Sequence, residues 1–169
     1  MKAALEIILP KLGLTDFLII SHQGVSDLEK SLPKKLRSWT NPNAKFLVLR
    51  DNDRGDCIAR KQKLIDIAKK AGRGEKTMVR IVCQELEAWF IGDQHALRSA
   101  GIIKGTSIPK SLRGEPDEQQ YPFKVLQGLK PDYQKIAGAK EIASSMDVDN
   151  NSSKSFNYTV AAVLKLASP

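Results

Sequence analysis

Three aspartates that follow a short apolar run are the residues of this chain best suited to chemistry. The run covers residues 46–49, and Asp51, Asp53 and Asp56 come soon after it. This pattern is typical of a buried strand that delivers acids to the edge of a sheet, because apolar side chains favour burial and carboxylates do not. Hard oxygen ligands suit Mg²⁺ or Mn²⁺. We therefore expect Asp51 and Asp53 to hold a divalent ion, with Asp56 as a further ligand.

The same stretch also fits a turn without any ligand. Asp and Asn side chains in residues 51–56 can bond their own backbone, and Gly55 permits a positive φ. The position of the acids favours the metal hypothesis, since ligands of open α/β sheets bind beyond the carboxyl ends of the strands. Spacing alone leaves both interpretations open.

Glu85 and Glu87 follow another apolar run, residues 79–82, and open a predicted helix. Acids in the first turn of a helix are stabilised by the helix dipole, which is a purely structural role. Two positions along a helix differ by about 200° in direction, so the two glutamates cannot both point at the aspartates. The functional interpretation is that one of Glu85 and Glu87, with Glu85 as the candidate, supplies a third ligand or a base at the same sheet edge.

Basic residues concentrate around the acidic stretch. Residues 30–80 hold 15 Lys and Arg against 5 Asp and Glu, whereas the rest of the chain holds 12 against 14. Cations around a metal site suit a polyanionic substrate such as nucleic acid, since they hold phosphates while the ion acts on one of them. A solvated helical face gives the same composition. The candidates for phosphate binding are Arg54, Arg60, Lys61 and Lys63.

Length and composition describe an ordinary globular domain. The chain has 169 residues, of which 41% are hydrophobic and 27% charged, and no stretch is apolar for long enough to span a bilayer. The start shows no leader pattern, and the two cysteines, Cys57 and Cys83, form no motif. We expect a cytoplasmic protein with reduced thiols, neither embedded in a membrane nor held together by disulfides.

The order of elements predicts a three-layer, Rossmann-like α/β fold. Short β-rich runs at residues 17–20, 46–49 and 79–82 are each followed by a helical pattern, which indicates a mostly parallel sheet with helices on both faces. His22, after the first run, fits a surface hydrogen-bonding role better than a place in the site. The chain opens on a helical pattern over residues 3–13, so we expect a further strand, ending in glutamates, ahead of Met1 in the natural product.

After the predicted core of residues 1–99, the chain becomes irregular. We expect residues 100–169 to add an elaboration and a closing helix within a single domain. Ser153 and Ser155 fit caps of that helix, and a phosphate seat is the alternative. The apolar face of the closing helix is formed by Phe156, Val160, Val163 and Leu164.

Three blocks of the sequence resemble an uncharacterised bacterial family. Residues 50–57, 80–93 and 151–156 are similar to successive signatures of the Toprim-like, RloB-type proteins encoded near ATPases in phage-defence and restriction loci. The resemblance implies a Toprim-like fold in which an Asp-x-Asp pair, here Asp51 and Asp53, holds Mg²⁺. It also implies a glutamate on a first strand, which this sequence lacks.

Two hypotheses from different classes follow. The first is a metal-dependent, nuclease-like phosphoryl-transfer enzyme in which Asp51 and Asp53 anchor the ion, Asp56 or Glu85 assists, and the basic side chains hold phosphates. The second is a non-catalytic adaptor with a degenerate Toprim site, which binds nucleic acid or an ATPase partner through the basic segment. Metal binding separates them, because a ligand of the folded state must raise thermal stability.

Overall fold

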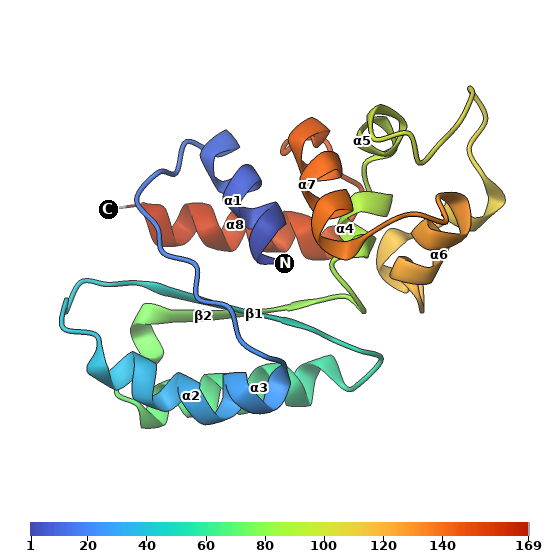
Figure 1. Cartoon of the computed structure of the whole chain (residues 1–169). Helices are drawn as coiled ribbons and strands as arrows, with labels where there is room; N and C mark the ends of the chain where they lie inside the picture. Colours follow the sequence, from blue (N-terminus) through green and yellow to red (C-terminus); the bar gives the residue numbers. More distant parts are fainter. Residues whose placement is uncertain (169) are drawn as a thin grey trace.

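A small parallel sheet lies between two layers of helices in the computed structural model of the chain, which describes residues 1–168 (Figure 1). Within these residues, strands β1 (Phe46–Asp51) and β2 (Thr77–Val82) pair in parallel, and their register places Asp51 beside Val82. Helices α2 (Val25–Ser38) and α3 (Cys57–Lys70) cover one face, while α1 (Lys2–Lys11), α7 (Lys135–Ser145) and α8 (Lys154–Ala167) lie on the other. The predicted α/β class, with helices on both faces of a parallel sheet, is confirmed. The remaining helices are α4 (Glu87–Ile91), α5 (Gln94–Ser99) and α6 (Pro122–Leu129), with 3-10 turns η1 (Gly74–Lys76), η2 (Lys110–Leu112) and η3 (Pro116–Glu118).

The alternation of side chains along β1 divides the molecule into two hydrophobic cores. Val48 packs with leucines of α2 and α3, while Leu47 and Leu49 pack against the larger core of α1, α4, α7 and α8. Because successive side chains of a strand point to opposite faces, Arg50 faces α2 and Asp51 faces α1 and α7. Arg50 accordingly contacts Glu29 of α2 at 3.2 Å. The strand thus delivers its terminal acid to the layer opposite the basic helices.

Residues 17–20, predicted as a strand, form no strand, so this prediction was wrong. The segment joins α1 to α2 and crosses from one helical layer to the other (Figure 1). It leaves Phe17, Leu18 and Ile20 exposed by 37%, 69% and 41%. An apolar, β-rich run becomes a strand only where its backbone can pair with a neighbour, and the sequence pattern carries no information about that neighbour.

Several local predictions are confirmed. The first helix, Lys2–Lys11, matches the helical pattern predicted over residues 3–13. Nδ1 of His22 shares a hydrogen bond with Oγ of Ser31 at 3.0 Å, as expected of a hydrogen-bonding role, but the side chain is partly buried rather than on the surface. Cys57 and Cys83 are free thiols. None of the described helices has the length and apolar character needed to cross a membrane.

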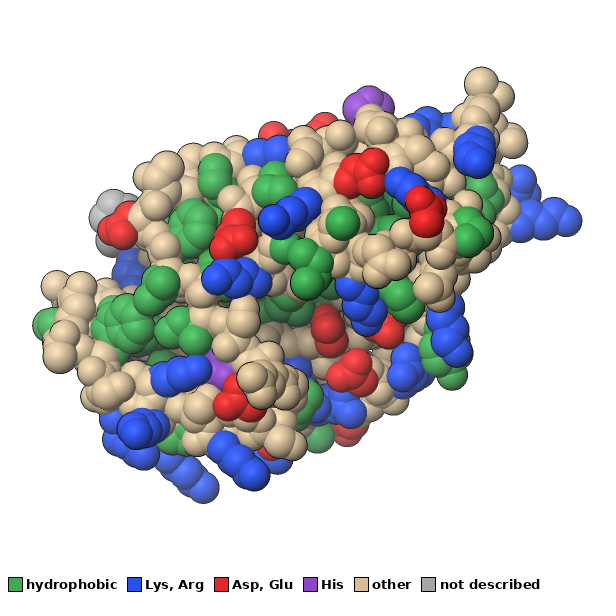
Figure 2. Space-filling model, in the orientation of Figure 1, with side chains coloured by type: hydrophobic (Ala, Val, Ile, Leu, Met, Phe, Trp, Pro, Cys, Tyr) green, Lys and Arg blue, Asp and Glu red, His purple; other side chains and the backbone are tan. Residues whose placement is uncertain are grey.

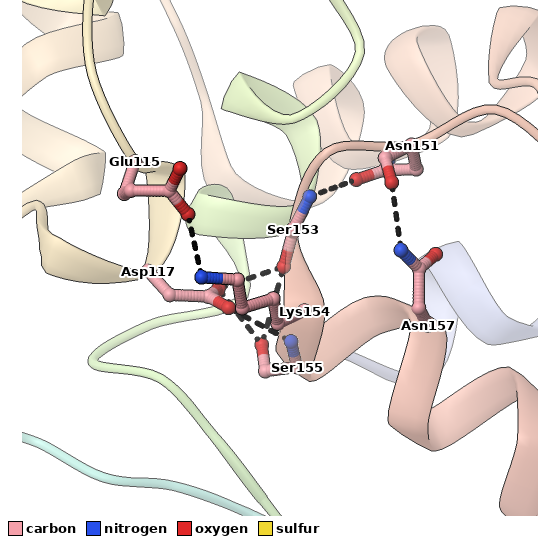
Figure 3. A network of polar contacts seen from close by, with 7 residues as sticks. All are labelled: Glu115, Asp117, Asn151, Ser153, Lys154, Ser155 and Asn157. Atoms are coloured by element: carbon pink, nitrogen blue, oxygen red, sulfur yellow. Dashed lines mark hydrogen bonds and ion pairs between the residues drawn. The ribbon is translucent and has the colours of Figure 1, made fainter.

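A polar network at the start of α8 anchors the segment that precedes α6 (Figure 3). Ser153 caps α8, because its Oγ accepts from the N–H of Phe156 at 3.1 Å. The carboxylate of Asp117 accepts from Oγ of Ser153 at 2.7 Å and from the N–H of Ser155 at 2.8 Å. Lys154 pairs with Glu115 at 3.1 Å. Ser153 is therefore the predicted cap, and Asp117 fills the position that a bound phosphate would take at this helix end.

Two helical glycines provide a matched test of the packing. A Cβ on Gly138 would overlap the ring of Tyr133, whereas a Cβ on Gly128 would meet open space. We expect Gly138→Ala to lower the free energy of unfolding by about 1–3 kcal/mol through overpacking. Gly128→Ala should raise it by up to about 1 kcal/mol, because alanine favours helix. Urea unfolding of both variants checks this, and equal effects would contradict the close packing of α7 on Tyr133.

Candidate functional site

A pocket at the carboxyl end of β1 lies on the side of the sheet that α1 and α7 cover. It has a volume of about 510 Å³, and its lining includes Asp51 at the end of β1 and Glu87 at the start of α4. Lys135 and Ile136, at the start of α7, and Ser21 also line it. Figure 2 shows acidic side chains gathered in the recess between the layers, with Lys and Arg around them. The pocket therefore combines buried carboxylates with a cationic rim.

Asp51 is held in an environment that disfavours its charge. Burial raises the pKa of its carboxyl group to about 7, and the neighbouring charges of Asp53 and Glu87 act in the same direction. Its Oδ1 is buried and has no hydrogen-bond partner within the described residues. A carboxylate that is desolvated and repelled by other acids is poised to bind a cation.

Glu87, rather than Glu85, shares the pocket with Asp51. Glu87 is only 3% exposed, forms no ion pair within residues 1–168, and has its pKa raised by burial. The nearby charge of Lys135 lowers that pKa and so favours the carboxylate. Glu85 has a structural partner instead, since its Oε2 accepts from the N–H of Phe123 at 3.0 Å. The chemical candidates at this end of the sheet are thus Asp51 and Glu87.

Asp53 and Asp56 occupy different surroundings from Asp51. Asp53 is exposed and lies close enough for its charge to raise the pKa of Asp51. Asp56 caps α3, because its Oδ1 accepts from the N–H groups of Ile58 and Ala59 at 2.9 and 3.1 Å. It is not in the pocket lining. No group of three or more His, Cys, Asp or Glu placed to hold a metal ion occurs in the described part of the chain.

The loops after the two strands are tied to each other in a strained conformation. Asp53, Arg54 and Gln84 have φ values of 46°, 60° and 55°, in the left-handed region that non-glycine residues rarely adopt. The N–H of Asp53 donates to the carbonyl of Gln84 at 3.0 Å, and the N–H of Arg54 donates to Oε1 of Gln84 at 2.7 Å. Strain of this kind persists only where the surroundings enforce it, and it clusters at functional sites.

Unpaired polar atoms concentrate around the same strand end. Buried side-chain atoms are normally hydrogen-bonded, so each exception needs an explanation. Burial and the charge of Glu87 raise the pKa of the Tyr133 hydroxyl, so Tyr133 lies near the pocket acid Glu87. The exceptions within residues 1–168 are Nε of Arg50, Oδ1 of Asp51, Oδ1 of Asn52, Nη1 of Arg60 and Oη of Tyr133. Three consecutive residues at the end of β1 therefore each carry a buried atom without a partner.

The predicted phosphate-binding residues fall into two groups. Arg54 and Arg60 lie at the acidic loop, residues 51–56. Arg54 follows Asp53, and a Cβ on Gly55 would overlap the guanidinium of Arg60. Lys61 and Lys63 lie further along α3, where Lys63 pairs with Glu29 at 2.6 Å. Only the first group is next to the acids.

Lys135 was not found from the sequence. It lies far from residue 51 along the chain and reaches the pocket because α7 packs beside α1. Its charge lowers the pKa of both Asp51 and Glu87, against the larger effect of burial. No local motif marks it, so only the folded chain could show that it belongs to the site.

Comparison with known proteins identifies a family without an assigned activity. A family model described as a domain of unknown function (DUF4276) matches residues 1–163. No curated protein and no solved structure matches the chain.

The raised pKa of Asp51 predicts how stability depends on pH. The ordinary pKa is 3.8 and the value in the folded protein is about 7, so the folded state holds this proton more tightly than the unfolded chain. The free energy of unfolding should therefore fall as the pH rises from about 4 to about 7. In EDTA, the unfolding temperature of Asp51→Asn minus that of the wild type should be larger at pH 8 than at pH 5 by about 3 °C or more. Parallel pH curves for the two proteins would contradict the burial of this charge.

Proposed function

We propose that this chain, which belongs to the DUF4276 family of unknown function, is a Mg²⁺- or Mn²⁺-dependent phosphoryl-transfer protein of the nuclease type, acting on nucleic acid. The observation that carries the proposal is the buried Oδ1 of Asp51, which has no hydrogen-bond partner within the described residues and belongs to a pocket that Glu87 also lines. A folded protein that leaves such atoms unpaired has a ligand to satisfy them or loses stability. Carboxylate oxygens beside a lysine, Lys135, fit a divalent cation together with a phosphate ester.

The pocket acids suit Mg²⁺ or Mn²⁺ without a third carboxylate. Mg²⁺ keeps several waters and is commonly bound through one or two carboxylates together with substrate phosphates. Asp51 and Glu87 supply two such carboxylates in one pocket, and the nearby charge of Asp53 acts on Asp51. A cation held there would act as a Lewis acid on a phosphate oxygen. Lys135 would hold a phosphate beside it.

The basic layer supports nucleic acid as the substrate class. Figure 2 shows Lys and Arg side chains along the lower edge of the molecule, where Figure 1 places α2 and α3. A polyanion lying on this layer gains affinity from the release of its counterions. The exposed basic residues of the two helices are Lys30, Lys34, Arg37, Lys63, Lys69 and Lys70.

Binding without catalysis is the second candidate. It is favoured by the finding that the described residues include no cluster of three metal-binding side chains. In this form the basic layer would bind nucleic acid, and the acids would hold an ion without chemistry. A partner ATPase, a phage-defence role and a cytoplasmic location are parts of the proposal that rest on the sequence resemblance.

Metal binding can be tested by replacing the two pocket carboxylates and, as a control, a carboxylate outside the pocket. Mn²⁺ should raise the unfolding temperature of the wild type, because the ion binds the folded state. Asp51→Asn and Glu87→Gln should abolish most of this rise, since each removes a charged ligand. Asp56→Asn is the matched control: asparagine keeps the helix cap, so the Mn²⁺ effect should remain. Calorimetric titration with Mn²⁺ checks all three variants, and an Asp51→Asn protein with unchanged affinity would overturn the metal site.

The basic layer can be tested through the salt dependence of binding. The affinity for nucleic acid should fall steeply with salt, and Lys61→Gln with Lys63→Gln should reduce the slope of log K against log salt by about 1 for each phosphate that the protein no longer neutralises. Lys165→Gln, an exposed change on α8, serves as the control and should leave the slope unchanged. Fluorescence anisotropy over a range of salt concentrations gives the slopes. If the double variant keeps the wild-type slope, the basic layer is a solvated face.

A further inference from the structure

An exposed tyrosine lies next to the acidic loop with two cations against its ring. The guanidinium carbon of Arg54 is 4.7 Å from the ring centroid of Tyr121, and Nζ of Lys124 is 5.0 Å from it. The tyrosine is nevertheless 48% exposed, and no hydrogen bond of its hydroxyl occurs within the described residues. A buried structural tyrosine normally hides its ring and pairs its hydroxyl. Tyr121 does neither, so the exposed part of its ring is accessible to a ligand beside the two cations.

We propose that Tyr121 is a stacking platform for an unpaired base, and that the site therefore takes single-stranded nucleic acid. This inference rests on the proposed function, whose substrate it defines more closely. Proteins that bind single strands combine a positively charged path for the backbone with aromatic side chains on which bases stack. Arg54 and Lys124 supply the positive charge, and Tyr121 supplies the aromatic face.

The platform is connected to the pocket by further cations and aromatic rings. Arg54 directly follows Asp53, whose charge acts on Asp51. On the α6 side, Nζ of Lys135 is 4.6 Å from the ring centroid of Phe123, and Lys135 also lines the pocket of Asp51 and Glu87. Basic and aromatic groups thus extend from Tyr121 to the carboxylates. A strand whose base stacks on Tyr121 would have its backbone phosphates led towards the acids.

The segment that carries Tyr121 is fixed at three points. Asp117 is bonded to the start of α8 through Ser153 and Ser155 (Figure 3). The carbonyl of Gln120 accepts from the guanidinium of Arg54 at 3.1 Å, and the N–H of Phe123 donates to Glu85 at 3.0 Å. A platform that is already ordered loses little conformational freedom when a base stacks on it.

The geometry favours a single strand over a duplex. A base can stack on a side chain only when it is free of its pairing partner, whereas a duplex offers its phosphates and groove edges. The basic layer of α2 and α3 would hold either form. Tyr121 is the feature of this surface that distinguishes them.

Binding measured in EDTA tests the inference separately from cleavage. The probes are fluorescent oligothymidylate and oligouridylate of about 20 nucleotides, with a duplex of the same length. We expect the single strands to bind more tightly than the duplex, and Tyr121→Ala to weaken single-strand binding by about tenfold or more. Tyr121→Phe should bind as the wild type does, because the ring and not the hydroxyl makes the contact. Tyr121→Leu, which keeps apolar bulk without an aromatic face, should behave like the alanine variant.

Tyr158→Ala is the matched control, since Tyr158 is a tyrosine on α8 that is 64% exposed. It should leave the affinity unchanged. Equal affinity of the duplex and the single strands, an unaffected Tyr121→Ala protein, or an equal loss in Tyr158→Ala would overturn the inference.

The same proteins are then assayed for cleavage with Mn²⁺. If single strands bind through Tyr121 but no cleavage occurs, the phosphoryl-transfer proposal is wrong and the stacking inference stands. If cleavage occurs at the same rate in Tyr121→Ala, the stacking inference is wrong and the phosphoryl-transfer proposal stands.

Discussion

The burial of a carboxylate at the end of a strand is the constraint on which the rest of this structure depends. Asp51 is the sixth residue of a strand whose alternation is set by Val48 on one face and Leu49 on the other. A shift of one residue in the register would turn the acid towards α2 and the basic helices. Both hydrophobic cores therefore act together to hold one charge where water cannot fully reach it. This desolvation raises the pKa of the Asp51 carboxyl group above its ordinary value.

Five acids discussed above fall into two groups, those that hold neighbouring segments in place and those that line the pocket. Glu85, Asp56 and Asp117 each accept backbone N–H groups, and they position α6, α3 and the segment before α6. Asp51 and Glu87 have no ion-pair partner within the described residues. A carboxylate at a helix start satisfies free N–H groups, whereas a carboxylate facing a pocket remains available to a ligand. Three of these carboxylates thus hold backbone segments in place, and two line the pocket.

Local patterns predicted the two strands and the acidic loop, because apolar runs and turn residues act over a few positions. They failed where the outcome depends on distant neighbours. Residues 17–20 have the composition of a strand but no pairing partner, and Lys135 reaches the pocket only through the packing of α7. The choice between Glu85 and Glu87 depended on where the helix begins. Gln84 adopts a left-handed conformation and α4 starts only at Glu87, and no residue pattern marks that turn.

The two cores on either side of the sheet are unequal in the side chains that fill them. The core under α2 and α3 contains few large side chains, whereas the opposite core includes Trp89, Phe90 and Phe156. Regions with fewer buried apolar contacts open at lower free energy than the rest of a protein. The basic layer is therefore the more readily detached part of the molecule, whereas α1, α4 and α7, which line the acidic pocket, belong to the more heavily packed part.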